Sequence, residues 1–174
     1  MAKKEAERLI WAVETLAVDP SDHILEIGCG AGVAVTLVCE KLNGGKVMAL
    51  DRSEAMIAQA RKRNQHAISS GKAVFQAAAL HQADFGGERF DKVFAFHVRS
   101  LWKQPARDLG VVKRVLRPGG MLFLFSQLPF GKEMQMQEFA SMLARVVKEH
   151  GFSLKEVVVK DMKPMPAVCV IAAM

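Results

Sequence analysis

The chain has 174 residues, which is the size of one compact domain, and we expect residues 1–174 to form a single domain. Hydrophobic residues make up 51% and charged residues 24%, and no apolar run approaches the roughly 18 residues of a membrane-spanning helix, so we exclude an integral membrane protein. The net charge of +6 would suit an anionic partner such as nucleic acid, but the basic residues are scattered, so we do not favour a nucleic-acid-binding protein.

The first predicted element is an amphipathic helix over residues 5–17. Leu9, Val13 and Leu16 recur at intervals of three and four residues, so they form an apolar stripe that packs on a core. We therefore expect residues 1–20 to form an N-terminal capping helix.

Short apolar runs then alternate with segments of helical periodicity, which predicts strands joined by crossover helices. Ser53 is the expected N-cap of the second crossover helix. The basic run Arg61-Lys62-Arg63 falls late in that helix, where a solvent-exposed face explains it better than a nucleic-acid patch. The expected strands span residues 23–27, 46–51, 72–77, 90–96, 120–125, 153–160 and 167–172, and the expected helices span 33–42, 53–68, 106–116 and the region around 139–147.

The last two strands break this alternation. Only a few residues separate them, whereas a parallel crossover needs a dozen or more, so they must form an antiparallel hairpin. The sequence therefore predicts an α/β fold: a three-layer α/β/α sandwich around a seven-stranded, mostly parallel sheet with an antiparallel C-terminal strand. Ligands of such sheets bind at the carboxyl ends of the strands.

A glycine-rich loop joins the first strand to the next helix. Gly28, Gly30 and Gly32 let a ligand approach backbone N–H groups without colliding with Cβ atoms, although glycines of a tight turn would show the same pattern. A dinucleotide-binding loop has its third glycine one position later, where this chain has Val33. The spacing therefore disfavours a nicotinamide-dependent oxidoreductase.

Asp51 ends the second strand about twenty residues after this loop, which is the spacing at which a carboxylate accepts hydrogen bonds from ribose hydroxyls. A charge at the N-terminus of the following helix is a compatible alternative. Loop and acid together are more specific than either alone.

Four features of the sequence closely resemble, in this order, landmarks of the class I (Rossmann-like) S-adenosylmethionine (SAM) dependent methyltransferases. They are the run Glu26-Ile27-Gly28-Cys29-Gly30-Ala31-Gly32, Asp51, the run Phe90-Asp91-Lys92-Val93 and the segment 115–122. The resemblance covers nearly the whole chain. It implies methyl transfer from SAM, with S-adenosylhomocysteine as product, to an acceptor that is either a small molecule or a macromolecular side chain. The alternative is a non-catalytic SAM-binding or interaction subunit. By position, the resemblance assigns cofactor binding to Glu26, Gly28, Cys29, Gly30, Gly32, Asp51, Arg52, Met56, Ala79 and His97.

One departure concerns the adenine. Many members of this family carry an acid shortly after the third strand, which receives the adenine amino group, but this chain has Ala78 near that position. The adenine would then rely on backbone contacts, on Gln76 or on Asp84. The loss of a charge-assisted hydrogen bond would lower affinity, since such bonds contribute about 1.5–3 kcal/mol.

Methyl transfer needs positioning, and no metal or covalent intermediate. His97 and Arg99 follow the fourth strand and are the candidate catalytic residues. His97 has a pKa range suited to a general base, but we favour a structural hydrogen bond or a backbone carbonyl facing the cofactor amine. Arg99 pairs either with an acidic substrate group or with a surface acid, and Trp102 either walls the acceptor pocket or belongs to the core. The segment lacks the Asn/Asp-Pro-Pro-aromatic motif of enzymes that methylate base amino groups.

Two segments could cover the pocket: the first helix with Trp11, and residues 127–136, although ordinary core packing explains the methionines of the second segment better. Cys29 could be a reactive thiol near a helix N-terminus, but packing beside the cofactor is the better interpretation.

The chain has three cysteines without close spacing, and acidic residues interrupt what would be the apolar part of an export signal. Both features suit a reducing compartment, so we expect a cytoplasmic protein. The sequence does not predict the oligomeric state.

Overall fold

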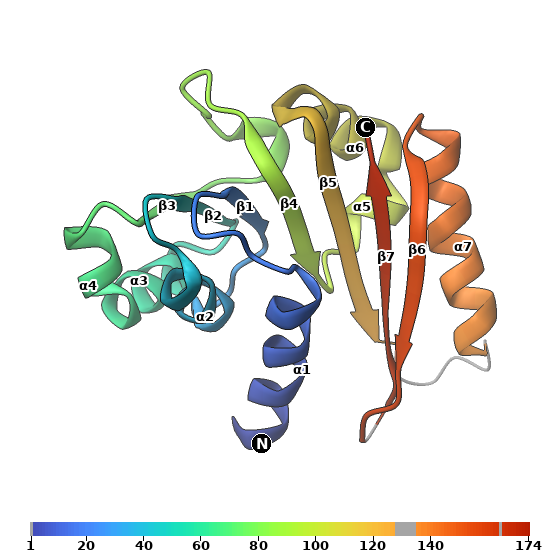
Figure 1. Cartoon of the computed structure of the whole chain (residues 1–174), viewed down its shortest axis with the longest axis horizontal. Helices are drawn as coiled ribbons and strands as arrows, with labels where there is room; N and C mark the ends of the chain where they lie inside the picture. The colour runs from blue at the N-terminus through green and yellow to red at the C-terminus, as the bar shows by residue number, and fades with distance from the viewer. Residues whose placement is uncertain (1, 128–134, 164) are drawn as a thin grey trace.

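The computed structural model describes residues 2–127, 135–163 and 165–174. Its centre is a seven-stranded sheet in the order β3-β2-β1-β4-β5-β7-β6 (Figure 1). Strand β7 pairs antiparallel with both β5 and β6, and the other neighbours pair in parallel, which confirms the predicted sheet and its terminal hairpin. The strands are β1 (His23–Ile27), β2 (Lys46–Asp51), β3 (Ala73–Ala77), β4 (Phe90–Phe96), β5 (Leu116–Gln127), β6 (Ser153–Lys160) and β7 (Ala167–Ala173).

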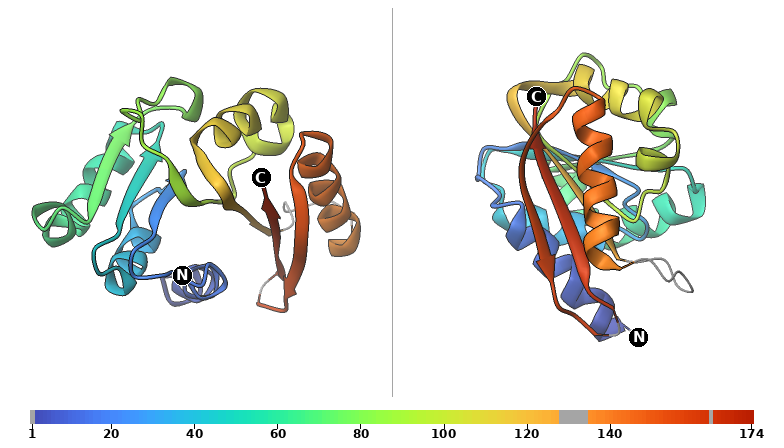
Figure 2. Two further views of the ribbon diagram at one scale, coloured as in Figure 1. Left: turned by 45° about the horizontal axis from the view of Figure 1, so that its top comes forward. Right: turned by 90° about the vertical axis from the view of Figure 1, so that its right-hand side faces the viewer.

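Helices cover both faces of the sheet, and Figure 2 shows the two layers on either side of it. One face carries α1 (Ala2–Thr15), α2 (Val33–Lys41), α3 (Glu54–Arg63) and α4 (Gln65–Ser69). The other face carries the 3-10 turn η1 (Leu80–Gln82), α5 (Ser100–Lys103), α6 (Pro105–Val115) and α7 (Met136–Glu149).

A separate hydrophobic core lies under each helical layer. Neighbouring residues of β5 alternate between them: Phe123 and Phe125 belong to the first core, and Leu122 and Leu124 to the second. A strand that is buried on both faces reads as one apolar run, which is why the central strands could be recognised from the sequence.

Several expected boundaries differ from the structure by a few residues, among them the helix expected over 5–17, which is α1 at Ala2–Thr15, and two of the differences have a clear physical reason. The helix expected over residues 53–68 is divided at Asn64, whose backbone leaves the helical region. Leu116, expected at the end of a helix, begins β5 instead because it is fully buried and pairs with Phe90 of β4. None of the helices in the described part of the chain is long and apolar enough to cross a membrane.

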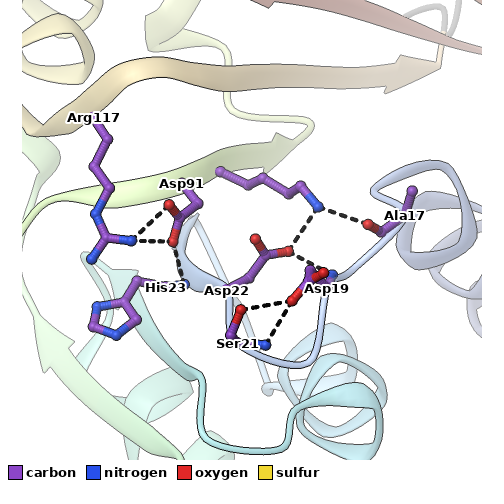
Figure 3. Close-up of polar contacts among 8 residues, drawn as sticks. Ala17, Asp19, Ser21, Asp22, His23, Asp91 and Arg117 are labelled. Atoms are coloured by element: carbon purple, nitrogen blue, oxygen red, sulfur yellow. Dashed lines mark hydrogen bonds and ion pairs between the residues drawn. The ribbon is translucent and has the colours of Figure 1, made fainter.

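The amino ends of β1 and β4 are joined by a network of charged side chains (Figure 3). Lys92 Nζ donates to Asp22 Oδ2 and to the carbonyl oxygen of Ala17, both at 2.7 Å, so it ties β4 to the segment between α1 and β1. Asp91 accepts hydrogen bonds from the backbone N–H of His23 and from Arg117. These contacts position the amino ends of the central strands, opposite the edge at which ligands of such sheets bind.

Replacing Lys92 by Met should lower the free energy of unfolding by about 2–4 kcal/mol, because Asp22 would be left buried without its cation. Urea unfolding measures the change. The control is Arg145→Met, which removes an exposed ion pair to Glu149 and should have no measurable effect. Equal losses of unfolding free energy in the two variants would show that the Lys92 contacts stabilise the protein no more than an exposed ion pair does.

Candidate functional site

A pocket of about 530 Å³ opens at the carboxyl ends of the parallel strands β1 to β4. Five parts of the chain contribute to it: the ends of these four strands with the residues that follow them, and the α5–α6 region. The lining residues are Ile27, Gly28, Leu50, Asp51, Arg52, Ala78, Ala79, Leu80, His81, Phe96, His97, Val98, Arg99, Ser100, Lys103, Gln104, Arg107 and Asp108.

The glycine loop is fastened to the end of β2 by three backbone N–H groups. Those of Gly28 and Cys29 both donate to the carbonyl oxygen of Leu50, at 2.7 and 2.9 Å. The N–H of Gly30 donates to Asp51 Oδ2 at 2.9 Å. The structure therefore brings the loop and the acid, which the sequence places about twenty residues apart, into direct contact.

Two glycines of the loop have no room for a side chain. Gly28 has a φ of +77°, and a Cβ there would lie 2.6 Å from Cγ2 of Val98. Gly32 has a φ of +75°, and a Cβ there would lie 2.7 Å from Nδ2 of Asn64. Gly30, in contrast, has open space where its Cβ would stand, so its backbone is accessible to a ligand.

Asn64, at the end of α3, anchors the glycine loop through hydrogen bonds. Its buried amide nitrogen donates to the carbonyl oxygens of Gly32 and Ala60, at 3.0 and 2.9 Å, and its oxygen accepts from Thr36. Sequence reasoning missed Asn64, because a lone asparagine late in a predicted helix gives no signal of a contact 32 residues away.

Asp51 lies between the loop and α3. Its second oxygen, Oδ1, accepts from the N–H of Ser53 at 2.9 Å, and the Ser53 hydroxyl caps α3 by accepting from Met56, as expected. A carboxylate has about four acceptor positions, so these two hydrogen bonds leave Asp51 with capacity for donors of a ligand. It is partly exposed and lines the pocket.

Glu26 is buried directly before the loop, and its Oε2 has no hydrogen-bond partner among the described residues. Burial, followed by repulsion from Asp51, raises the pKa of Glu26 to about 8. Glu26 is therefore a buried carboxyl group that is protonated at neutral pH.

Cys29 is buried, and desolvation raises the pKa of its thiol well above the ordinary value. The thiol therefore stays protonated near neutral pH, which is the opposite of what a nucleophilic cysteine needs.

His97 directly follows β4 and has a φ of 61°, a left-handed conformation that is rare for residues other than glycine. Its Nε2 lies 3.4 Å from Oε1 of Gln127, and its Nδ1 lies 3.5 Å from the hydroxyl oxygen of Ser126. Desolvation lowers the pKa of His97. The contact with Gln127 raises this pKa, and the positive charge of Arg8 lowers it further. The ring is therefore neutral around pH 7.

The two tryptophans pack in the cores. Trp11 is buried with its ring edge-on to Phe125, at 5.4 Å between centroids, and Trp102 packs edge-on to Phe139 at 6.0 Å. Neither lines the pocket. Most of the other expected covering segment, residues 128–134 of 127–136, lies outside the described residues.

The structure gathers about half of the predicted site residues around the pocket. Gly28, Asp51, Arg52, Ala79, His97 and Arg99 line it, whereas Glu26, Cys29, Gly30, Gly32 and Met56 are not among the lining residues. Sequence reasoning missed Lys103, Arg107 and Asp108 of the α5–α6 region, because nothing in their spacing links them to the glycine loop.

Residues 25–124 match the family model described as "Methyltransferase domain". The chain is 28% identical over 126 residues to the ubiquinone/menaquinone biosynthesis C-methyltransferase UbiE of Paracoccus denitrificans, which covers 69% of this chain and 50% of that protein. It is 23% identical to the uncharacterized methyltransferase YdaC of Bacillus subtilis, over 93% of this chain and 88% of that one. Apart from YdaC, the chain spans about half or less of the length of the curated relatives it matches.

Among solved structures, the chain is similar to the SAM-bound magnesium protoporphyrin IX methyltransferase of Synechocystis PCC 6803. The TM-score is 0.72, the sequence identity is 15%, and the match covers 99% of this chain and 79% of the other. This likeness concerns the fold.

Glu26→Gln should stabilise the protein at alkaline pH. Because the pKa of Glu26 rises from 4.5 to about 8 on folding, its contribution to stability is complete below pH 4.5 and is lost as the pH rises through 8. The variant should therefore match the native protein near pH 4.5 and exceed it by about 2–4 kcal/mol at pH 9, measured by urea unfolding. A variant with the native pH dependence would contradict the raised pKa, and Glu149→Gln serves as the exposed control.

Proposed function

The chain belongs to the class I SAM-dependent methyltransferase family, and we propose that it binds SAM and transfers its methyl group to a small-molecule acceptor. The observation that supports this most directly is the glycine loop bound to Asp51 at the mouth of the pocket. The relative UbiE is named for ubiquinone and menaquinone biosynthesis, which favours a small molecule over a macromolecule. We also propose that residues 1–174 act as a single domain.

The residues present fit this cofactor. Gly28, which lines the pocket, and the open space at the Cβ position of Gly30 in the same loop suit the methionine portion. The free acceptor positions of Asp51 suit ribose hydroxyls. Arg52 and Ala79 line the part of the pocket proposed for ribose and adenine. When bound, SAM supplies an electrophilic methyl group on a sulfonium.

The chain's own contribution to the chemistry centres on the end of β4. The His97 ring is neutral around pH 7, and because Oε1 of Gln127 can only accept, Nε2 carries the hydrogen. Nδ1, beside the Ser126 hydroxyl, is then the nitrogen that would accept a proton from an acceptor hydroxyl or amine. The strained backbone of His97 alternatively serves to turn its carbonyl toward the cofactor amine. Arg99 is exposed at the pocket and suits an acidic group of the acceptor.

The function is tested by ligand-induced stabilisation and label transfer. S-adenosylhomocysteine should raise the melting temperature and NAD should not, because a ligand stabilises only a protein that binds it. Methyl-labelled SAM incubated with the protein and a small-molecule extract should yield labelled small molecules. Stabilisation by NAD alone would refute SAM binding. SAM binding without transfer to any extract fraction would favour the non-catalytic alternative.

Substitutions of Asp51 and His97 should separate binding from turnover. Asp51→Ala should weaken S-adenosylhomocysteine binding tenfold or more, measured by calorimetry, because it removes the proposed ribose acceptor and the contact with Gly30. His97→Ala should mainly lower kcat. Asp51→Asn keeps one acceptor oxygen and should be less affected than Asp51→Ala, and unchanged affinity in the Ala variant would refute the ribose assignment.

A further inference from the structure

The adenine position lacks an acid where the family usually has one. Ala78 occupies that position and lines the pocket. Gln76 and Asp84, the alternatives that the sequence offers, bond to each other instead. The N–H of Asp84 donates to Oε1 of Gln76 at 3.1 Å. Asp84 Oδ1 accepts from the N–H of Gly86 at 2.9 Å. Neither Gln76 nor Asp84 lines the pocket.

A different carboxylate does line it. Asp108, in the first turns of α6, has a side chain that is only 2% exposed. Within the described residues its one side-chain partner is Nε of its neighbour Arg107, which donates to Oδ1 at 2.8 Å. The other oxygen, Oδ2, has no hydrogen-bond donor there. Apart from Asp51, Asp108 is the only acidic residue of the pocket lining.

The fold explains how α6 comes to face the adenine position. Between β3 and β4 the chain makes only the three-residue turn η1, so no crossover helix shields that edge of the second core. Helix α6 packs against η1, and Leu80 of η1 and Leu109 of α6 share one core. The first turns of α6 and the residues after β3 therefore line the same pocket.

Burying the Asp108 carboxylate at this position costs free energy unless it receives further hydrogen bonds. Burial of a charged group is unfavourable without good partners, and Arg107, its one partner, is itself 45% exposed. In the first turns of α6 a negative charge interacts favourably with the helix dipole. Asp108 is thus kept ready to accept a hydrogen bond from a donor that enters the pocket.

We propose that Asp108 takes the place of the missing acid after β3 and accepts a hydrogen bond from the exocyclic amino group of the adenine of SAM. The inference rests on the proposed function. The acid that recognises the amino group then comes from α6, and the small side chain of Ala78 leaves room for this approach.

The test compares two ligands that differ at this edge of the base: S-adenosylhomocysteine, and S-inosylhomocysteine, in which a carbonyl oxygen replaces the amino group and the neighbouring N1 carries a hydrogen. Native protein should bind the adenosyl ligand about ten- to a hundredfold more tightly, because the carboxylate bonds to the amine and repels the carbonyl. Asp108→Asn should reduce this preference to near one, since an amide serves either group equally well. Calorimetry measures both affinities, and the melting temperature verifies that the variant folds.

Asp84→Asn is the matched control and should keep the native preference, because Asp84 does not line the pocket. The inference is overturned if Asp108→Asn also keeps the native preference, or if Asp84→Asn loses it instead. If native protein binds both ligands equally, no acid recognises the amino group, and the inference fails while the proposed function stands. Binding of neither ligand would overturn the proposed function itself.

Discussion

The geometry of the pocket depends on the hydrogen bonds that fasten the glycine loop to the end of β2. Strands β1 and β2 pair in parallel up to Ile27 and Leu50, and the next three N–H groups of the loop then bond to Leu50 and Asp51. The chain can turn this sharply only because Gly28 and Gly32 adopt left-handed backbone angles without side chains that would collide with Val98 and Asn64. One small contact region therefore fixes the loop, the acid and the start of α2 relative to one another.

Much of this arrangement could be predicted from local patterns. Buried strands are apolar runs, helices show their spacing, and a short connection excludes a parallel crossover, so the sheet and its hairpin follow from the sequence. The proximity of Gly30 and Asp51 also follows, because Asp51 ends one strand and Gly30 lies in the loop that follows the neighbouring parallel strand.

The rest depends on tertiary packing that no local pattern encodes. Asn64 ends one helix and holds a loop 32 residues away, and its signal is only that of a polar residue in a helix. Leu116 begins a strand because burial against β4 outweighs its helical spacing. Asp108 reaches the pocket because the connection between β3 and β4 is short, and this consequence becomes visible only when α6 is seen to pack on η1. Long-range contacts, rather than propensities, placed these three residues.

The acidic residues at the two ends of the sheet differ in how many hydrogen bonds they receive. At the amino ends every acid of the network in Figure 3 has at least two donors: Asp19 from Ser21, Asp22 from Asp19 and Lys92, and Asp91 from His23 and Arg117. At the carboxyl ends, within the described residues, Oε2 of Glu26 has no partner and Asp108 has one. Proteins satisfy nearly all their buried polar groups, so the unpartnered Oε2 of Glu26 directly before the glycine loop is an exception of the kind that functional sites show. The two acids of the pocket lining, Asp51 and Asp108, keep free acceptor capacity, which suits a ligand that brings donors, as the amines and hydroxyls of SAM do.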